Sequence, residues 1–176
     1  MFELKICGYE ELQHVIARWQ PTHVLSVLNG METLPGNHLF IEVSDIPRPM
    51  EGHIHPARAH LEQVFEFTAK LTADDRLLVH CYAGMSRSTA IAIGVLIQHG
   101  MDSETAFDHV AAIRPILMPN EMFIQLIDEY FALSGDLVKI VADFRDSEMQ
   151  RVNPPDGVRS QASIAAMKSL LLRMGY

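Results

Sequence analysis

The stretch that decides the fold lies at residues 77–97 and reads LLVHCYAGMSRSTAIAIGVLI. Its first three residues are apolar and end in a β-branched valine, which is typical of a short buried strand. Residues 89–97 are almost entirely apolar, which indicates a helix buried on all sides. Residues 80–88 between them therefore predict a tight loop that joins the end of a strand to the start of a helix.

This loop combines groups that suit a phosphate ester. Backbone N–H groups that turn inward beside the positive end of a helix form an anion site. That setting favours the thiolate form of Cys81, which is the nucleophilic form. Arg87 can reach back across the loop mouth and bind two phosphate oxygens at once. Gly84 lets the backbone approach the anion, and Ser88 places a hydroxyl near the sulfur, where it can stabilise the departing thiolate.

The plainer interpretation makes Cys81 a small buried hydrophobic residue and Arg87 an ordinary surface residue. Average residue usage argues against it, because a His-Cys pair with Gly, Arg and Ser at these offsets arises very rarely by chance. We therefore interpret the loop as functional.

The spacing His-Cys-x5-Arg-Ser resembles the signature loop of the cysteine-based protein tyrosine phosphatases, particularly the compact dual-specificity group. The resemblance implies a catalytic domain over residues 1–135 and a two-step reaction through a phosphocysteine, with no metal or other cofactor. It implies that His80 helps to order the thiolate, although a histidine at a strand end is often only hydrogen-bonded to backbone. The phosphate would be bound by the loop itself, namely Tyr82, Ala83, Gly84, Met85, Ser86 and Arg87.

Such a reaction needs a general acid for the leaving oxygen and a base for the water. Asp45 is the candidate, because it follows an apparent strand and enters a proline-bearing loop 36 residues before Cys81. The alternative is an ordinary turn or capping aspartate. Glu51 shares the same loop, whereas Asp74 and Asp75 precede the strand at 77–79 and more readily mark a turn.

Asn120 lies in a third segment of interest, residues 114–120, which reads RPILMPN. The segment resembles the one that follows the second helix after the signature loop in the phosphatase family. There the resemblance implies that the asparagine supports the phosphate loop from behind. An equally good interpretation is a helix N-cap, because apolar residues follow Asn120 at helical spacing.

Strands and helices alternate along the first half of the chain. Strands are expected at 3–6, 23–28, 39–43 and 76–80, and helices at 10–19 and 56–71. Helical patterns follow at 88–98, 102–113 and 121–133. This alternation predicts an α/β fold with a central, mainly parallel sheet and helices on both faces, as the resemblance to the dual-specificity group also implies.

Composition limits the possible partners and the compartment. The chain has 176 residues, and its net charge of −8 argues against binding nucleic acid or an anionic membrane through a basic face. The start has charges where a signal peptide needs an apolar core, and no apolar run approaches the ~20 residues of a membrane span. Cys7 and Cys81 cannot build a disulfide framework, so we expect a reducing, cytoplasmic location. Cys7 could be a redox partner, but a packed cysteine is the simpler interpretation.

The remainder, 136–176, is expected to form an extension that ends in a helix at 160–174, after a turn at 153–157. That helix would pack on the catalytic domain, or alternatively form a dimer or bind a partner. The histidines at 53, 55 and 60 lack the ligands that would complete a metal site, so solvated side chains are expected.

The loop interior contains no lysine, whereas relatives that act on inositol phosphates often place extra cations there. The sequence therefore favours a phosphoprotein substrate, with phosphotyrosine first and phosphoserine or phosphothreonine also allowed. The alternatives are a phosphatase of a small phosphorylated metabolite such as an inositol phosphate, and a phosphopeptide-binding pseudophosphatase. Low-molecular-weight phosphatases and arsenate reductases fit less well, because their loop lies near the N-terminus.

Overall fold

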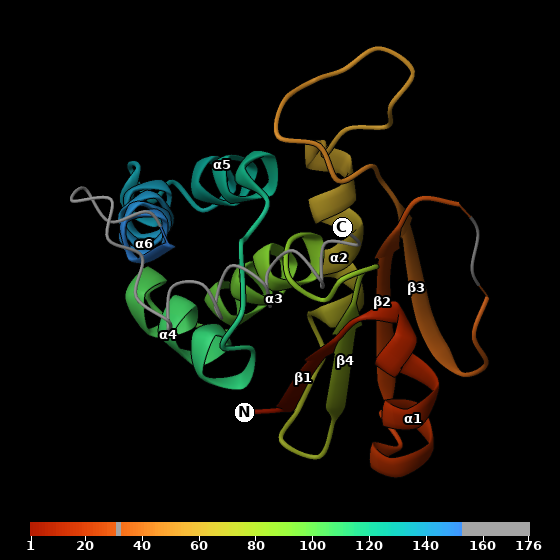
Figure 1. The fold of residues 1–176 in the computed structure, drawn as a ribbon. Helices are drawn as coiled ribbons and strands as arrows, with labels where there is room; N and C mark the ends of the chain where they lie inside the picture. The colour runs from red at the N-terminus through yellow and green to blue at the C-terminus, as the bar shows by residue number, and fades with distance from the viewer. Residues whose placement is uncertain (31–32, 153–176) are drawn as a thin grey trace.

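A parallel sheet forms the centre of the molecule, with helices on either side of it (Figure 1). The computed structural model describes residues 1–30 and 33–152. Within these residues the sheet has four strands in the order β1-β4-β2-β3, and every neighbouring pair is parallel. The strands are β1 (Glu3–Cys7), β2 (His23–Leu28), β3 (Asn37–Glu42) and β4 (Arg76–His80). Because the strands point the same way, the residues that follow them gather along one edge.

The apolar run of β4 is explained by its central position between β1 and β2. Leu77, Leu78 and Val79 are all completely buried, because helices cover both faces of the sheet at this strand. The strand ends at His80, so Cys81 begins the connection at the carboxyl edge.

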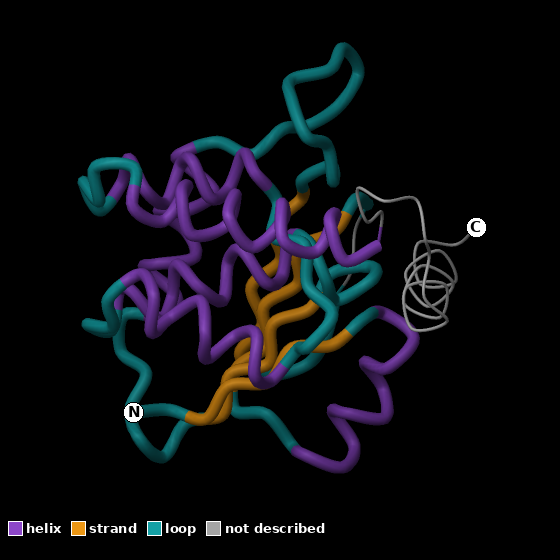
Figure 2. Tube along the Cα trace, turned by 60° about the vertical axis from the view of Figure 1, so that its left-hand side comes forward, coloured by secondary structure: helices purple, strands orange, loops and turns teal. Residues whose placement is uncertain are grey.

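The two faces of the sheet are covered unequally, as Figure 2 shows. On one face α1 (Tyr9–Trp19) packs Leu12 against Cys7, Val24 and Leu78. The opposite face carries the larger core, to which the remaining helices contribute. These are α2 (Arg58–Thr68), α3 (Arg87–Gln98), α4 (Ser103–Ile113), α5 (Glu121–Tyr130) and α6 (Asp136–Val152). The predicted fold class is therefore confirmed.

Helix α3 is the buried helix that its apolar sequence predicted, because every residue from Arg87 to Ile97 is buried. Gly94 allows α5 to approach it closely. A Cβ atom at Gly94 would lie 2.9 Å from Cδ1 of Ile127. Packing on all sides fixes the axis of α3, whose N-terminus consequently meets the carboxyl edge of the sheet.

Helix α6 lies in a part of the chain for which the sequence predicted no element. Leu137 and Val141 are buried in the main core, so the helix packs on the α/β body. Its start is held by Asp128 of α5, whose carboxylate accepts hydrogen bonds from the N–H groups of Gly135 and Leu137. The helix that was expected at 160–174, and with it the expected dimer contact, lies outside the described residues.

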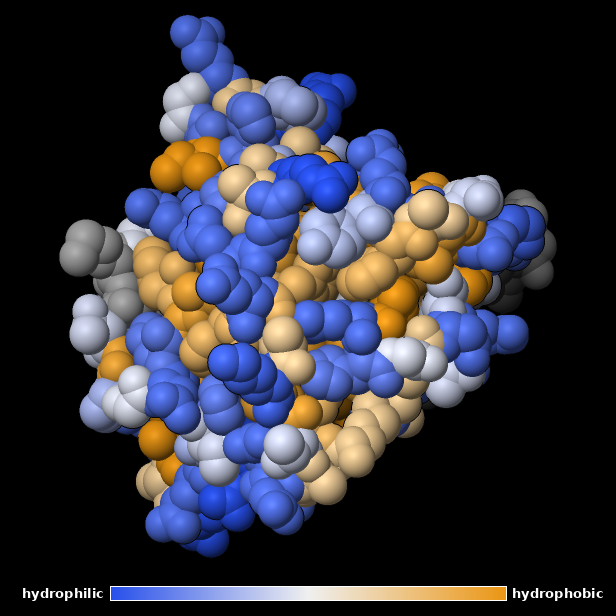
Figure 3. Space-filling model, turned by 180° about the vertical axis from the view of Figure 1, so that it is seen from behind, coloured by the Kyte–Doolittle hydropathy of each residue, from blue (hydrophilic) through white to orange (hydrophobic). Residues whose placement is uncertain are grey.

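The connection between β3 and α2 projects from the body at the top of Figure 1. Residues 47–55 of this connection are all exposed. The view from behind shows hydrophilic residues over much of that face and over the projecting loop (Figure 3). In the ranges 1–30 and 33–152, no helix has both the length and the apolar character to span a membrane.

Candidate active site

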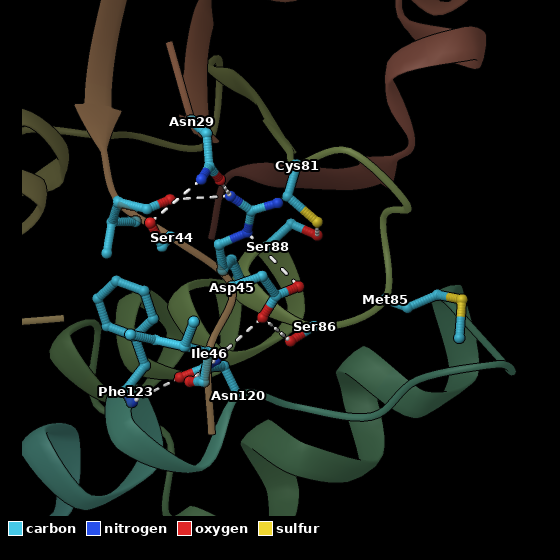
Figure 4. Close-up of polar contacts among 12 residues, drawn as sticks. Asn29, Ser44, Asp45, Ile46, Cys81, Met85, Ser86, Ser88, Asn120 and Phe123 are labelled. Carbon is cyan, nitrogen blue, oxygen red and sulfur yellow. Dashed lines mark hydrogen bonds and ion pairs between the residues drawn. The ribbon is translucent and has the colours of Figure 1, made fainter. Parts of the chain in front are cut away.

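The site is built on the sulfur of Cys81, which is fully buried at the end of β4. Its Sγ accepts a hydrogen bond from the backbone N–H of Gly84 at 3.2 Å. The hydroxyl oxygen of Ser88, in the first turn of α3, lies 3.2 Å from the same sulfur (Figure 4). Both groups can donate to a thiolate, and the N-terminus of α3 adds its positive end.

The loop backbone is held so that its carbonyl groups turn outward. Each carbonyl from residue 82 to residue 86 accepts a hydrogen bond from a donor beyond those five residues. The donors are Tyr9 N to Tyr82 O, Arg114 to Ala83 O and Gly84 O, Met118 N to Met85 O, and Asn120 N to Ser86 O. This arrangement leaves the N–H side of the loop for the sulfur and for an anion.

The backbone conformation of Gly84 and a close contact behind the loop both require a glycine at this position, in addition to the predicted approach to an anion. Its φ is 69°, which side-chain-bearing residues rarely adopt. A Cβ atom there would lie 2.5 Å from the carbonyl carbon of Cys7 and 2.6 Å from the nitrogen of Gly8. The close approach is therefore to the β1–α1 connection behind the loop.

Arg87 is buried at the start of α3, with 4% of its surface exposed. Its Nη1 donates to Oδ1 of Asn29 at 2.6 Å and to the carbonyl of Val43 at 2.8 Å, which fixes the plane of the guanidinium. Its Nε has no hydrogen-bond partner among the residues that the structure describes. A buried N–H of this kind is costly to leave unpaired, and a phosphate oxygen would satisfy it.

Asp45 lies at the mouth of the site, with its side chain 35% exposed. Its Oδ1 accepts hydrogen bonds from Oγ of Ser86 at 2.7 Å and from Nδ2 of Asn120 at 3.0 Å. Its Oδ2 forms an ion pair with Nε of Arg87 at 3.6 Å. The predicted acid therefore faces the same point as the guanidinium.

Asn120 satisfies both interpretations that the sequence left open. Its Oδ1 accepts from the N–H of Phe123, so it is the N-cap of α5. Its backbone N–H donates to the carbonyl of Ser86, so it also supports the loop. In addition its Nδ2 donates to Asp45 and to the carbonyl of Ile46. Asn120 therefore links the loop that carries Asp45, the acid loop, to the phosphate loop at residues 80–88.

The side chains of the loop differ in where they lie. Met85 is buried and lies apart from the polar cluster (Figure 4), so it contributes to the site through its backbone. Tyr82 is 70% exposed and stacks on Tyr9, with the ring centroids 6.5 Å apart. This aromatic pair stands on the outer side of the loop.

His80 lies beneath the loop and is completely buried. Its Nε2 lies 2.5 Å from Oγ of Ser26 on the neighbouring strand. Burial, and to a smaller extent the nearby His38, lowers the pKa of His80 to about 4, although an interaction with the Cys81 backbone acts in the opposite direction. His80 is therefore neutral near pH 7, which suits a supporting role and not proton transfer.

The rival carboxylates lie away from the sulfur. Asp75 is at the opposite end of β4, where hydrogen bonds from the backbone and side chain of Thr72 lower its pKa, and Asp74 belongs to the same turn. Glu51 is exposed in the projecting loop.

The histidines that we considered as metal ligands are also separate from the site. His53 and His55 are exposed, and Nδ1 of His60 accepts the N–H of Ala57 at the start of α2. In the described part of the chain, no three His, Cys, Asp or Glu side chains are grouped so that they could hold a metal ion.

Sequence reasoning missed several residues of this site. Asn29 orients Arg87, and Arg114 braces the loop while its Nη2 pairs with Glu11 at 2.9 Å. The sequence could have indicated Asn29, because this residue directly follows a predicted strand and therefore lies at the carboxyl edge of the sheet. Nothing in the sequence indicated Arg114, because its partners are backbone carbonyls some thirty residues earlier.

A groove of about 320 Å³ adjoins the site on the side of α6. Asp45 and Ser86 are among its lining residues, so the groove adjoins the mouth of the loop that carries Cys81. Its walls are mostly apolar and include Ile46, Pro47, Met118, Pro119 and Met149. Its cation, Arg145, forms an ion pair with Glu121.

A cysteine on a phosphate-type loop, an arginine fixed across it and an aspartate at its mouth define a class of cysteine-dependent phosphatase sites. Residues 9–132 match the family model for the dual specificity phosphatase catalytic domain. The chain therefore belongs to the dual specificity phosphatase family.

The relatives agree with this assignment. A probable dual specificity protein phosphatase of Dictyostelium discoideum is 32% identical over 122 residues, which cover 67% of this chain and 29% of that protein. Dual specificity protein phosphatase 15 of Mus musculus is 32% identical over 120 residues, which cover 65% of this chain and 48% of that protein. The matched region thus spans less than half the length of these two relatives.

Among solved structures, human DUSP28 superposes with a TM-score of 0.61 at 26% identity, covering 74% of this chain and 90% of that one. The fold and the order of elements are therefore those of a compact dual specificity phosphatase.

Proposed function

We propose that this protein hydrolyses phosphomonoesters on proteins, with phosphotyrosine as the leading substrate and phosphoserine or phosphothreonine also accepted. The observation that carries the proposal is the buried Nε of Arg87, which has no hydrogen-bond partner among the described residues and lies near a cysteine whose sulfur already accepts a hydrogen bond. An anion with several oxygens, attached to an electrophilic centre, fits this arrangement better than any other ligand.

In the first step the Cys81 thiolate attacks phosphorus, so that an S–P bond forms and the P–O bond to the leaving group breaks. The loop N–H groups and the Nε edge of Arg87 bind the equatorial oxygens, where negative charge is spread. Asp45 donates its proton to the departing oxygen.

In the second step a water attacks the phosphocysteine and Asp45 takes up the proton of that water. The S–P bond breaks, inorganic phosphate leaves and the thiolate returns. The hydroxyl of Ser88, 3.2 Å from the sulfur, stabilises the thiolate as it departs. This reaction calls on no metal, and since it needs a reduced thiol we place it in the cytoplasm.

Two features support a protein substrate over an inositol phosphate. The loop side chains include no lysine that would bind additional phosphates. The groove beside Asp45 is mostly apolar, and its arginine is already paired with Glu121. A peptide with a large apolar residue next to the phosphorylated one would fill this groove.

A substrate panel under reducing conditions and without added metal tests the proposal. Phosphotyrosine peptides should show the highest kcat/KM, and Cys81→Ser should abolish turnover while peptide binding remains measurable. A higher kcat/KM for an inositol phosphate would move the assignment to small metabolites. Binding without turnover by the unmodified protein would identify a pseudophosphatase.

The groove can be tested separately with Met149→Glu, because Met149 is 53% exposed at the outer wall. This variant should lower kcat/KM for a peptide with an apolar flank and leave that for a small aryl phosphate unchanged. An equal loss on both substrates would contradict a role of the groove in peptide recognition.

A further inference from the structure

A line of hydrogen bonds crosses three strands behind Cys81. Nε2 of His38 on β3 lies 2.8 Å from Oγ of Ser26 on β2, and Oγ of Ser26 lies 2.5 Å from Nε2 of His80 on β4. At its outer end, Nδ1 of His38 accepts the backbone N–H of Leu34 at 3.0 Å. At its inner end, the ring of His80 interacts with the backbone of Cys81, which raises the pKa of His80.

Strand register explains why these side chains meet. Val24 pairs with His38 and Ser26 pairs with His80. Because side chains alternate between faces, Val24 and Ser26 point to the same side of β2, which α1 covers. The three polar groups therefore lie in a row on an otherwise apolar face, and both Ser26 and His80 are completely buried.

The row can carry its hydrogens in only one order while both rings are neutral. Nδ1 of His38 accepts from Leu34, so its hydrogen is on Nε2 and is donated to Ser26. The hydroxyl of Ser26 then donates to Nε2 of His80. The hydrogen of His80 is consequently on Nδ1, the nitrogen left for the Cys81 backbone.

We propose that His38 is a positioning residue, which acts through Ser26 to fix the tautomer and the ring plane of His80 and thereby the backbone of the nucleophile. His80 then presents an N–H to the Cys81 backbone, which adds a positive dipole behind the sulfur and favours the thiolate. The kinetic part of this inference rests on the proposed function, whereas its chemical part concerns only the reactivity of Cys81.

The test is the rate of Cys81 alkylation by iodoacetamide as a function of pH, read by peptide mass spectrometry, so that turnover is not needed. His38→Leu fills the same space with an apolar side chain but removes the N–H that donates to Ser26. It should shift the midpoint of the profile upward and slow alkylation at pH 6 by about fivefold, the worth of one hydrogen bond. His38→Gln, whose amide N–H can reach Ser26, should restore most of the rate.

His14→Leu is the matched control, because His14 is an exposed histidine on α1. Its profile should equal that of the unmodified protein. Ser26→Ala removes a single oxygen and should reproduce the effect of His38→Leu. If His38→Leu does not fold, Ser26→Ala by itself tests the proposal. In the double variant the two losses should not add, because they interrupt one chain.

An unchanged pH profile in Ser26→Ala, or additive losses in the double variant, would overturn the proposal. If the alkylation shifts are found but no phosphopeptide is turned over, the positioning role stands and the proposed function fails.

Discussion

The loop that carries the nucleophile and the loop that carries the acid are held in different ways. In residues 81–88 every carbonyl from 82 to 86 is engaged, and a glycine fits against the β1–α1 connection. The acid loop is exposed throughout residues 47–55, and Asp45 is anchored mainly through its own carboxylate, to Ser86 and Asn120. The difference indicates that the anion-binding loop is rigid. The side chain of Asp45, in contrast, can adjust to leaving groups that lie at different depths in the site.

The largest expected effect breaks the acid side of this comparison. Asp45→Asn preserves the shape of the side chain but cannot donate a proton to the leaving oxygen. It should lower kcat for a phosphotyrosine peptide by about 10²–10⁴-fold. The loss should be much smaller for an activated aryl phosphate, whose leaving group needs no proton.

Glu51→Gln is the control in the same loop and should leave both rates unchanged, because Glu51 is exposed in the projecting part of that loop. If Glu51→Gln shows the large loss and Asp45→Asn does not, the acid has been misassigned.

A smaller but still large effect is expected from Arg87→Lys. The positive charge remains, yet an ammonium cannot contact Asn29, Val43 and a phosphate in one plane. The value of kcat/KM should fall by about 10²–10³-fold. Arg58→Lys on α2, whose side chain is 64% exposed, should have no such effect. Near-normal activity of Arg87→Lys would mean that the site needs only a positive charge and not the planar guanidinium held in a fixed orientation.

Gly84→Ala and Gly52→Ala compare the two loops directly through their stability. Both glycines have positive φ, at 69° and 78°, but only Gly84 is crowded, since no atom lies within 4 Å of a Cβ at Gly52. Denaturant unfolding should show a loss of about 1 kcal/mol for Gly52→Ala. The loss for Gly84→Ala should be about 3 kcal/mol, because steric overlap is added. Equal losses would contradict the idea that the nucleophile loop is the more tightly fixed one.

A last effect, on the pH dependence of stability, concerns the histidine beneath the nucleophile loop. The pKa of His80 is about 4 in the folded protein, against 6.5 for an ordinary histidine. Between these values only the unfolded chain binds the proton, so the stabilisation is complete above pH 6.5 and is lost as the pH falls towards 4. Protonation of His80 in the unfolded chain should make the free energy of unfolding about 2 kcal/mol lower at pH 5 than at pH 7.

Denaturant unfolding at pH 7 and pH 5 measures this loss. His80→Asn should remove that part of the pH dependence, whereas His53→Asn in the exposed acid loop should keep it. An unaltered pH dependence in His80→Asn would assign the effect to other groups.

Much of the fold could be predicted from sequence because its strongest signals are local. The apolar run of β4 and the all-apolar helix α3 record burial on every side, and the alternation of elements gave the parallel sheet. Helix α6 was missed because its polar residues outnumber the apolar ones that reach the core, and its start depends on Asp128 in another helix.

The residues of the candidate site also fall into those that local sequence could predict and those that depend on the fold. Cys81, Arg87 and Ser88 are close in sequence, so their spacing alone placed them together. Asp45 could be predicted from its position after a strand. The contacts of Arg114 and of the pair His38 and Ser26 depend on strand register and loop direction, which one sequence does not reveal.

The central claim is that Cys81 takes the phosphoryl group from the substrate. The direct measurement is an acid quench of the protein during turnover of a phosphotyrosine peptide, followed by mass analysis of its proteolytic fragments. The fragment that contains Cys81 should carry one added phosphoryl group in the unmodified protein and none in Cys81→Ser. Turnover without any phosphorylated Cys81 fragment, or turnover by Cys81→Ser itself, would contradict the account.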